Sequence, residues 1–172
     1  MNTFLSQFTP YTYPLLGLVR LPSITISDQD KAAVGVKSNA TNAVYLKNLV
    51  WKEYLVKREA GKFDGITEAQ VKDRLVFEFD VLQKTGMLDY ILVIRDMVIQ
   101  AKKQGIPVGP GRGSVAGSLT CFLCGITKIN SLRHRLNFTR FISEARVKPK
   151  IIDGVTDAEL RALCDIDVDF SI

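Results

Sequence analysis

The chain has 172 residues, of which 47% are hydrophobic and 24% are charged, and this composition is typical of a soluble globular protein with one core. Lysine and arginine exceed aspartate and glutamate by 23 to 18, an excess that allows a polyanionic partner but does not indicate one by itself. No apolar run reaches the roughly 18 residues of a membrane span, and the N-terminus does not resemble a signal peptide. We therefore expect a cytoplasmic protein without a membrane partner.

Residues 1–40 are expected to form an N-terminal extended arm on the domain surface. Three prolines within the first 22 residues prevent one continuous helix there, and a short strand is expected at 15–19. Ser27, which precedes two acidic residues, predicts the start of a short helix over 30–36.

Three longer segments carry apolar residues at helical spacing, and each has a recognisable start or end. They are 42–60, 67–86 and 88–104. Thr41 can cap the first, and Thr67 with Gln70 predicts a capping box at the start of the second. The third has an apolar centre at 90–94 that also fits a buried strand. We expect helical hairpins that pack on a sheet.

Residues 106–108 predict a short strand that leads directly into a glycine-rich turn at 109–114, and the pattern from 115 to 124 is again helical. A strand, a glycine-rich turn and a helix together direct bare backbone N–H groups and the positive end of a helix at an anion. The turn lacks the ending of a Walker A loop and is not a G-x-G-x-x-G fingerprint. The alternative is a tight connection whose glycines serve only the turn.

Four residues of this turn are candidates for binding a phosphate group. Gly111 and Gly113 permit positive φ and let a phosphate approach the main chain. Arg112 adds a permanent charge with a planar fork of donors, and Ser114 adds a hydroxyl.

The helical segment after the turn contains two cysteines of a C-x-x-C pair, Cys121 and Cys124. They lie in an apolar run, the chain has no second such pair, and it contains a single histidine. We interpret both as small buried hydrophobic residues rather than as zinc ligands or a redox pair.

A basic stretch covers residues 128–146. Within it Arg140 lies between Phe138 and Phe141, so packing of the two rings is expected to hold its backbone while the guanidinium points outward. For most of the other basic residues a solvated surface is the preferred interpretation. Residues 147–163 are expected to form a surface excursion with a short helix after Thr156.

The last nine residues alternate between acidic and apolar side chains, which predicts a strand with one acidic and one buried face. Asp165, Asp167 and Asp169 form the first face, and Ile166, Val168 and Phe170 form the second. Neighbouring carboxylates about 6 to 7 Å apart repel by roughly 2 to 3 kcal/mol at an effective dielectric of about 20. Mg²⁺ would offset this repulsion and binds one or two carboxylates together with substrate phosphates. The alternative is an edge strand with a solvated polar face.

Taken together, these motifs resemble the palm of family-C replicative DNA polymerases, represented by the bacterial DNA polymerase III alpha subunit. The matching runs are 106–114 (Ile-Pro-Val-Gly-Pro-Gly-Arg-Gly-Ser), 116–119 (Ala-Gly-Ser-Leu), 125–127 (Gly-Ile-Thr), 138–142 and 164–170. The last run differs from the family's Pro-Asp-Ile-Asp-Ile-Asp-Phe in that Cys164 replaces the proline. The resemblance extends from about residue 44 to the end of the chain.

The resemblance implies an α+β fold: a polymerase-beta-like nucleotidyltransferase palm at 41–172, with an incomplete mixed sheet flanked by helices. It implies that Asp165 and Asp167 are catalytic and hold two Mg²⁺ ions for template-directed DNA synthesis. It also implies that the turn and Arg140 bind the triphosphate of a dNTP, the candidate residues being Gly111, Arg112, Gly113, Ser114 and Arg140. Primer-template DNA would be the other substrate.

The chain departs from the family pattern because it ends before the third metal-binding aspartate, the fingers and the thumb. The linker between 146 and 165 is also longer than in the family. Two hypotheses account for this. In one, the protein is a piece of a split polymerase, as in a phage or an interrupted gene, and a second polypeptide supplies the missing parts. In the other, it is a catalytically incomplete module that binds or regulates another polymerase.

Overall fold

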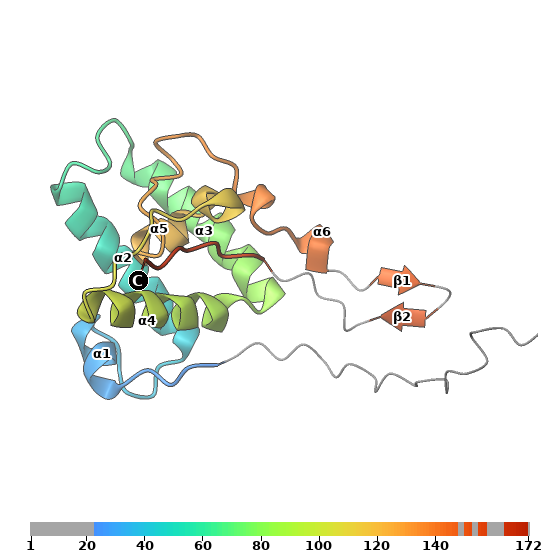
Figure 1. The fold of residues 1–172 in the computed structure, drawn as a ribbon, viewed down its shortest axis with the longest axis horizontal. Coiled ribbons are helices and arrows are strands. Elements are labelled where there is room, and N and C mark those ends of the chain that lie inside the picture. The colour runs from blue at the N-terminus through green and yellow to red at the C-terminus, as the bar shows by residue number, and fades with distance from the viewer. Residues whose placement is uncertain (1–22, 148–149, 153–154, 158–163, 172) are drawn as a thin grey trace, which may run out of the picture.

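The computed structural model describes residues 23–147, 150–152, 155–157 and 164–171, and helices form most of this part (Figure 1). The α-helices are α1 Asp28–Ala33, α2 Asn42–Glu59, α3 Glu68–Thr85, α4 Leu88–Lys103, α5 Leu119–Leu123 and α6 Glu144–Val147. Two short 3₁₀ helices, η2 Gly113–Gly117 and η3 Phe138–Arg140, and two strands, β1 Lys150–Ile152 and β2 Val155–Asp157, are also present. The strand predicted at 15–19 and the helix predicted after Thr156 fall in segments outside the described residues.

The predicted starts of the first three helices are confirmed by their capping hydrogen bonds. Ser27 caps α1 by accepting a hydrogen bond from the backbone N–H of Asp30, and Thr41 caps α2 in the same way. Thr67 and Gln70 form the predicted capping box of α3, because each side chain bonds the backbone N–H of the other residue. These starts depend on contacts over three residues, which explains why they can be predicted locally.

The segment that also fitted a buried strand is the helix α4. Its buried residues, Ile91, Leu92, Val98 and Ala101, recur at helical rather than alternating spacing.

Part of the predicted N-terminal arm is described as well: residues 23–40 carry α1 and pack against the core through half-buried aliphatic side chains.

The short helix α5 lies in the hydrophobic core. All five of its residues are buried, and it packs against α2 and α3. Several completely buried large side chains come from these helices and α4: Leu46, Tyr54, Leu82, Ile91, Leu119 and Leu123. Cys121 and Cys124 are buried free thiols in the same core. The predicted burial of both cysteines is therefore confirmed.

The predicted α+β fold, a polymerase-beta-like palm with an incomplete mixed sheet, is wrong for the described residues. The sheet present there is an antiparallel pair of three-residue strands, β1 and β2. The expected strands at 106–108 and 164–172 share one isolated bridge, Val108 to Phe170, and a second bridge joins Asp167 to Arg112 of the glycine-rich turn. Alternating residues favour an extended backbone with one buried face, but a sheet also needs neighbouring strands that continue the ladder. In the described part, Ile166 and Val168 pack on a helical core instead.

The helix predicted over 115–124 is divided in two. Residues Gly113–Gly117 form η2, and α5 starts only after Ser118, whose side chain caps it by accepting a hydrogen bond from the N–H of Cys121. Serine in an extended conformation is a favoured N-cap and interrupts the preceding helical turn. The glycine-rich turn thus leads into a 3₁₀ turn and then into a buried helix.

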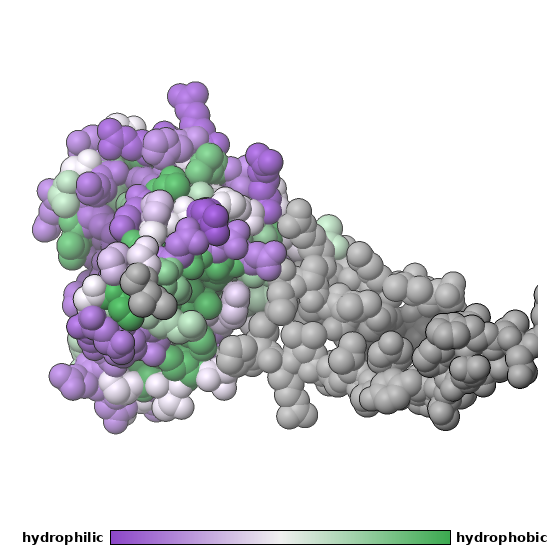
Figure 2. Space-filling view, in the orientation of Figure 1, coloured by the Kyte–Doolittle hydropathy of each residue, from purple (hydrophilic) through white to green (hydrophobic). Residues whose placement is uncertain are grey.

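The segment 164–171 crosses one face of the helical domain as an extended chain (Figure 1). The space-filling view of this face shows apolar surface gathered at its centre and hydrophilic residues around it (Figure 2).

Among the described helices, none combines the length and apolar composition that a membrane span requires.

Candidate functional site

The acidic segment and the glycine-rich turn lie side by side and run antiparallel. Their backbones are joined by three hydrogen bonds: Gly109 N to Asp169 O (2.9 Å), Arg112 N to Asp167 O (3.0 Å) and Ser171 N to Pro107 O (3.1 Å). The two isolated bridges, Val108 to Phe170 and Arg112 to Asp167, belong to the same pairing. Two segments far apart in the sequence therefore form one local structure.

The alternation of the acidic segment produces the predicted faces over residues 165–169. Asp165, Asp167 and Asp169 are exposed, whereas the residues between them are half-buried against the core. Phe170 is 41% exposed, so the apolar face ends at Val168 rather than at Phe170 as predicted. The carboxylates are consequently accessible to a ligand from outside the chain.

Gly113 brings the turn into contact with the acidic segment. A Cβ atom at this position would lie 3.0 Å from Asp167 Oδ2, and the φ of Gly113 is +65°. Gly111 has a φ of +82°, and its Cβ would lie 2.8 Å from the Cγ2 atom of Thr127. Both positions therefore favour glycine for their backbone conformation, and Gly111 also for space. The turn is held between Thr127 and Asp167.

Arg112 pairs with an aspartate of the acidic segment. Its Nη2 lies 3.0 Å from Asp169 Oδ1, and the two side chains are 66% and 52% exposed. An ion pair so exposed to water contributes little stability. The phosphate-binding role that the sequence predicted for Arg112 would therefore compete with an acidic partner.

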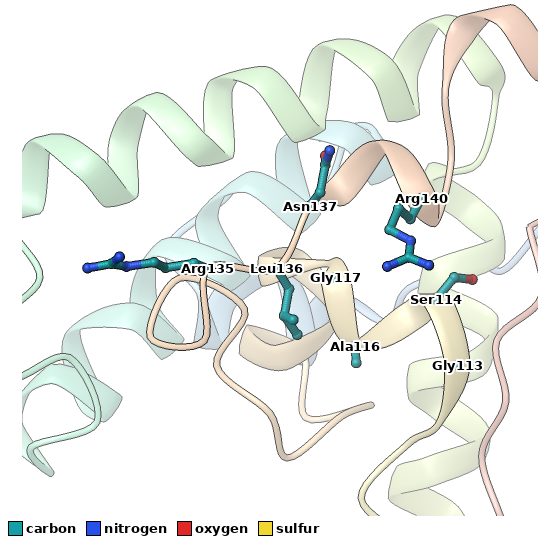
Figure 3. Close-up of a pocket in the computed structure, with 8 residues that line it drawn as sticks. All are labelled: Gly113, Ser114, Ala116, Gly117, Arg135, Leu136, Asn137 and Arg140. Carbon is teal, nitrogen blue, oxygen red and sulfur yellow. The ribbon is translucent and has the colours of Figure 1, made fainter.

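A cavity of about 710 Å³ lies beside the turn and has two walls. One wall is Gly113, Ser114, Ala116 and Gly117, and the other is Arg135, Leu136, Asn137 and Arg140. Figure 3 shows the Arg140 guanidinium directed toward Ser114, whereas Arg135 points away from it. Of the predicted site residues, the cavity brings together Gly113, Ser114 and Arg140.

The expected packing around Arg140 is confirmed. Phe138 and Phe141 are 0% and 1% exposed, while Arg140 itself is exposed on the cavity wall. The ring of Phe138 also contacts Phe77 of α3 edge to face, with centroids 5.8 Å apart. Helix α3 thus supports the wall that carries this arginine.

The whole region that contains the turn, the cavity walls and the acidic segment corresponds to one known family. Residues 44–171 match the family model described as the bacterial DNA polymerase III alpha NTPase domain. The chain belongs to this family. The resemblance inferred from the motifs is therefore confirmed.

Similar proteins of the family come from distant bacteria. The DNA polymerase III subunit alpha of Thermotoga maritima is 40% identical over 116 residues, which cover 67% of this chain and 13% of that protein. The subunit of Aquifex aeolicus is 36% identical over 135 residues, or 78% of this chain and 10% of that protein. The subunit of Chlamydia pneumoniae is 38% identical over 155 residues, or 87% and 12% respectively. The chain thus spans a small fraction of the length of its polymerase relatives.

The described residues contain no group of three or more histidine, cysteine, aspartate or glutamate side chains able to hold a metal ion. The three cysteines, Cys121, Cys124 and Cys164, are buried free thiols. Burial raises the pKa of Cys124 to about 12 and that of Cys164 to about 11. Beside the cavity wall, Asp167 Oδ2 lies 3.0 Å from the Cβ position of Gly113 and could serve as an oxygen ligand.

Sequence reasoning missed most of the second cavity wall in this polymerase domain. Arg135 was interpreted as part of a solvated basic surface, yet it lines the cavity and has a φ of +52°. Asn137 caps η3 by accepting a hydrogen bond from the N–H of Thr139. An asparagine two residues before a threonine is a recognisable local cap. Its position opposite the glycine-rich turn had no signal in the sequence.

Proposed function

We propose that this chain carries part of the nucleotidyl-transfer site of a DNA polymerase. In this proposal the cavity beside Gly113 and Ser114 binds the triphosphate of a dNTP, and Asp165 and Asp167 bind Mg²⁺. The observation that carries the proposal is the contact between the turn and the acidic segment: Arg112 N donates to Asp167 O at 3.0 Å. The proposed triphosphate cavity is therefore adjacent to accessible carboxylates.

The cavity has the groups that an extended phosphate chain requires. Ser114 offers a hydroxyl on one wall, and Arg140 faces it from the other with a planar set of charged donors (Figure 3). A volume of about 710 Å³ lies within the usual range for small-ligand sites. Because Arg140 is directed toward Ser114, the two can bind successive parts of one triphosphate.

The acidic segment fits a partial magnesium site. Asp165 and Asp167 are both exposed, and Asp167 Oδ2 lies next to the position where Gly113 would have a side chain. Mg²⁺ binds to one or two protein carboxylates and completes its ligands with phosphate oxygens and water. When bound, it supplies charge neutralisation at the phosphates and activation of the primer hydroxyl. The role of the two aspartates is to hold this charge beside the triphosphate.

We further propose that a second polypeptide supplies the third metal-binding aspartate, the fingers and the thumb, which together bind primer-template DNA. This proposal extends the family resemblance, because the polymerases of the family carry these parts. The chain would then act as a polymerase only in the completed assembly.

The test is a calorimetric titration of the chain with dATP, with and without MgCl₂. Mg²⁺ is expected to tighten binding to the natural sequence and to have no effect on the double variant Asp165→Asn/Asp167→Asn. Ser114→Ala and Arg140→Gln are expected to weaken binding under both conditions. If dATP does not bind, or if these variants bind it normally, the proposal is wrong. Reconstitution with the product of an adjacent gene, followed by templated dNTP incorporation, tests the completed assembly.

The alternative is a catalytically incomplete module that binds or regulates another polymerase. The ion pair between Arg112 and Asp169, 3.0 Å long, favours it because the pair occupies a predicted ligand-binding group with an internal partner. This alternative predicts a stable complex with a full-length polymerase. Substitution of Asp165 and Asp167 would leave that complex unchanged, whereas it abolishes activity in the split-polymerase assembly.

A further inference from the structure

We propose that Arg74 and Glu78 of α3 are positioning residues that set the distance between the two walls of the cavity. Neither residue lines the cavity, and the inference rests on the proposed function of the cavity as a triphosphate site. Their side chains reach from α3 to the base of both walls.

Glu78 is a carboxylate buried completely in the core, with a relative exposure of 0%. Its two oxygens accept hydrogen bonds from Arg74 Nε (2.7 Å), Leu119 N (2.8 Å), Thr120 Oγ1 (2.8 Å), Thr120 N (2.9 Å) and Ser118 Oγ (3.1 Å). A buried charge is tolerated only when it is paired and hydrogen-bonded in this way. The carboxylate therefore fixes the start of α5, which directly follows η2.

Arg74 lies one helical turn before Glu78 and connects the two walls. Its Nη2 donates to the carbonyl of Gly117 at 2.6 Å and to the carbonyl of Leu136 at 3.0 Å. Gly117 belongs to the first wall, and Leu136 belongs to the second. The ion pair with Glu78 holds the guanidinium in place, and the side chain is only 17% exposed. One cation thus ties together two segments that meet only in the folded chain.

Gly117 allows the walls to approach closely at this point. A Cβ atom on Gly117 would lie 2.7 Å from the carbonyl oxygen of Asn137, so any larger residue would push the walls apart. The main chain of Asn137 cannot move away freely, because the neighbouring Leu136 is bonded to Arg74. Arg74 therefore ties the two walls together, and Gly117 leaves the space that their close approach needs.

The width matters because the two proposed triphosphate ligands are on different walls. Ser114 is in η2, and Arg140 is at the end of η3. A ligand that spans both walls loses affinity when their separation changes, whereas a small anion that uses one wall does not. In catalysis, a displacement of about one ångström can lower a rate by about a hundredfold. A ligand that is held by both walls is expected to lose affinity for the same geometric reason.

The experiment compares inorganic tripolyphosphate, which can span both walls, with inorganic phosphate, which cannot. The chain carrying Arg74→Gln is expected to bind tripolyphosphate at least about tenfold more weakly than the natural sequence, with phosphate binding unchanged. Arg74→Lys keeps the charge but lacks the fork, so an intermediate loss is expected. The matched control is Arg58→Gln, which removes the arginine of an exposed ion pair with Glu68 and should change neither affinity.

A second variant separates positioning from folding. Gly117→Ala removes no charge and no hydrogen bond, and it is expected to lower the affinity ratio of tripolyphosphate to phosphate as Arg74→Gln does. Circular dichroism gives the folded fraction, and both affinities refer to folded protein. A purely structural role would lower the melting temperature of each variant while leaving the affinity ratio unchanged, and that result would overturn the inference.

The outcomes also separate this inference from the proposed function. If Ser114→Ala and Arg140→Gln weaken tripolyphosphate binding but Arg74→Gln and Gly117→Ala do not, only the positioning role is wrong. If the natural sequence itself does not bind tripolyphosphate, the cavity is not a triphosphate site, and both proposals are wrong.

Discussion

The protein contains carboxylates in two contrasting settings, one inside the core and one on its surface. Glu78 is completely buried and accepts hydrogen bonds from both the side chain of Arg74 and the main chain of α5. Asp165 and Asp167 are exposed on an extended segment beside the glycine-rich turn. The comparison shows that a carboxylate whose hydrogen bonds are all internal serves the fold. Exposed carboxylates beside a cavity remain available to a ligand.

The largest effect is expected when the buried carboxylate is removed. Glu78→Ala leaves the guanidinium of Arg74 without its partner in the core and several donors unsatisfied. Loss of one member of a buried ion pair typically costs about 3 to 5 kcal/mol of unfolding free energy, which urea denaturation measures. Glu68→Ala, in an exposed pair with Lys72, is the matched control and should leave the unfolding midpoint nearly unchanged. If Glu78→Ala and Glu68→Ala were equally stable, the buried carboxylate would not stabilise the fold more than the exposed one.

Removal of the surface carboxylates should have the opposite result. Asp165→Ala and Asp167→Ala are expected to retain the stability of the natural sequence, because both side chains are exposed. The same variants should lose the enhancement of dATP binding by Mg²⁺, as measured by calorimetry. Asp64→Asn, an exposed carboxylate on the loop between α2 and α3, should keep it. A large loss of stability in the first two variants would mean that these aspartates serve the fold instead.

Gly113 links the turn to the surface carboxylates, so Gly113→Ala should disturb both. Its φ of +65° is costly for alanine, and the new Cβ would lie 3.0 Å from Asp167 Oδ2. The backbone strain should lower the unfolding free energy by about 1 to 2 kcal/mol. Gly35→Ala is the control, since Gly35 has a φ of +75° with nothing within 4 Å of its Cβ. Similar loss of stability is expected in both variants, but only Gly113→Ala should weaken Mg²⁺-dependent dATP binding.

The last expected effect is confined to alkaline pH and concerns the buried thiols. Burial raises the pKa of Cys124 from its usual 9.0 to about 12, so the folded protein disfavours the thiolate. The resulting stability is fully present below pH 9 and is lost as the pH rises toward 12, because the unfolded chain ionises first. The unfolding free energy should therefore fall between pH 9 and pH 11. Cys124→Ala should reduce this slope, and an unchanged slope would show that other groups cause it.

The sequence predicted those features that depend on neighbours along the chain. Thr41 and Thr67 cap their helices over three residues, and the alternation at 165–169 produces one exposed and one half-buried face. The conformation of the turn was also predicted: Gly111 and Gly113, which were expected to permit positive φ, both have positive φ. Membership of the DNA polymerase III alpha family followed from the same short motifs and is confirmed over 44–171.

The tertiary structure alone decided which segments meet. Local pattern favoured a strand at 164–172, but whether neighbouring strands extend it into a sheet depends on distant residues, and a mixed sheet was wrongly predicted. Three other features likewise depend on residues far apart in the sequence. They are the second wall of the cavity, the ion pair of Arg112 with Asp169 and the hydrogen bonds of Glu78. Hydrogen bonds within one helical turn are fixed by spacing. Contacts across the core depend on how complete helices pack, and that information is spread over the whole chain.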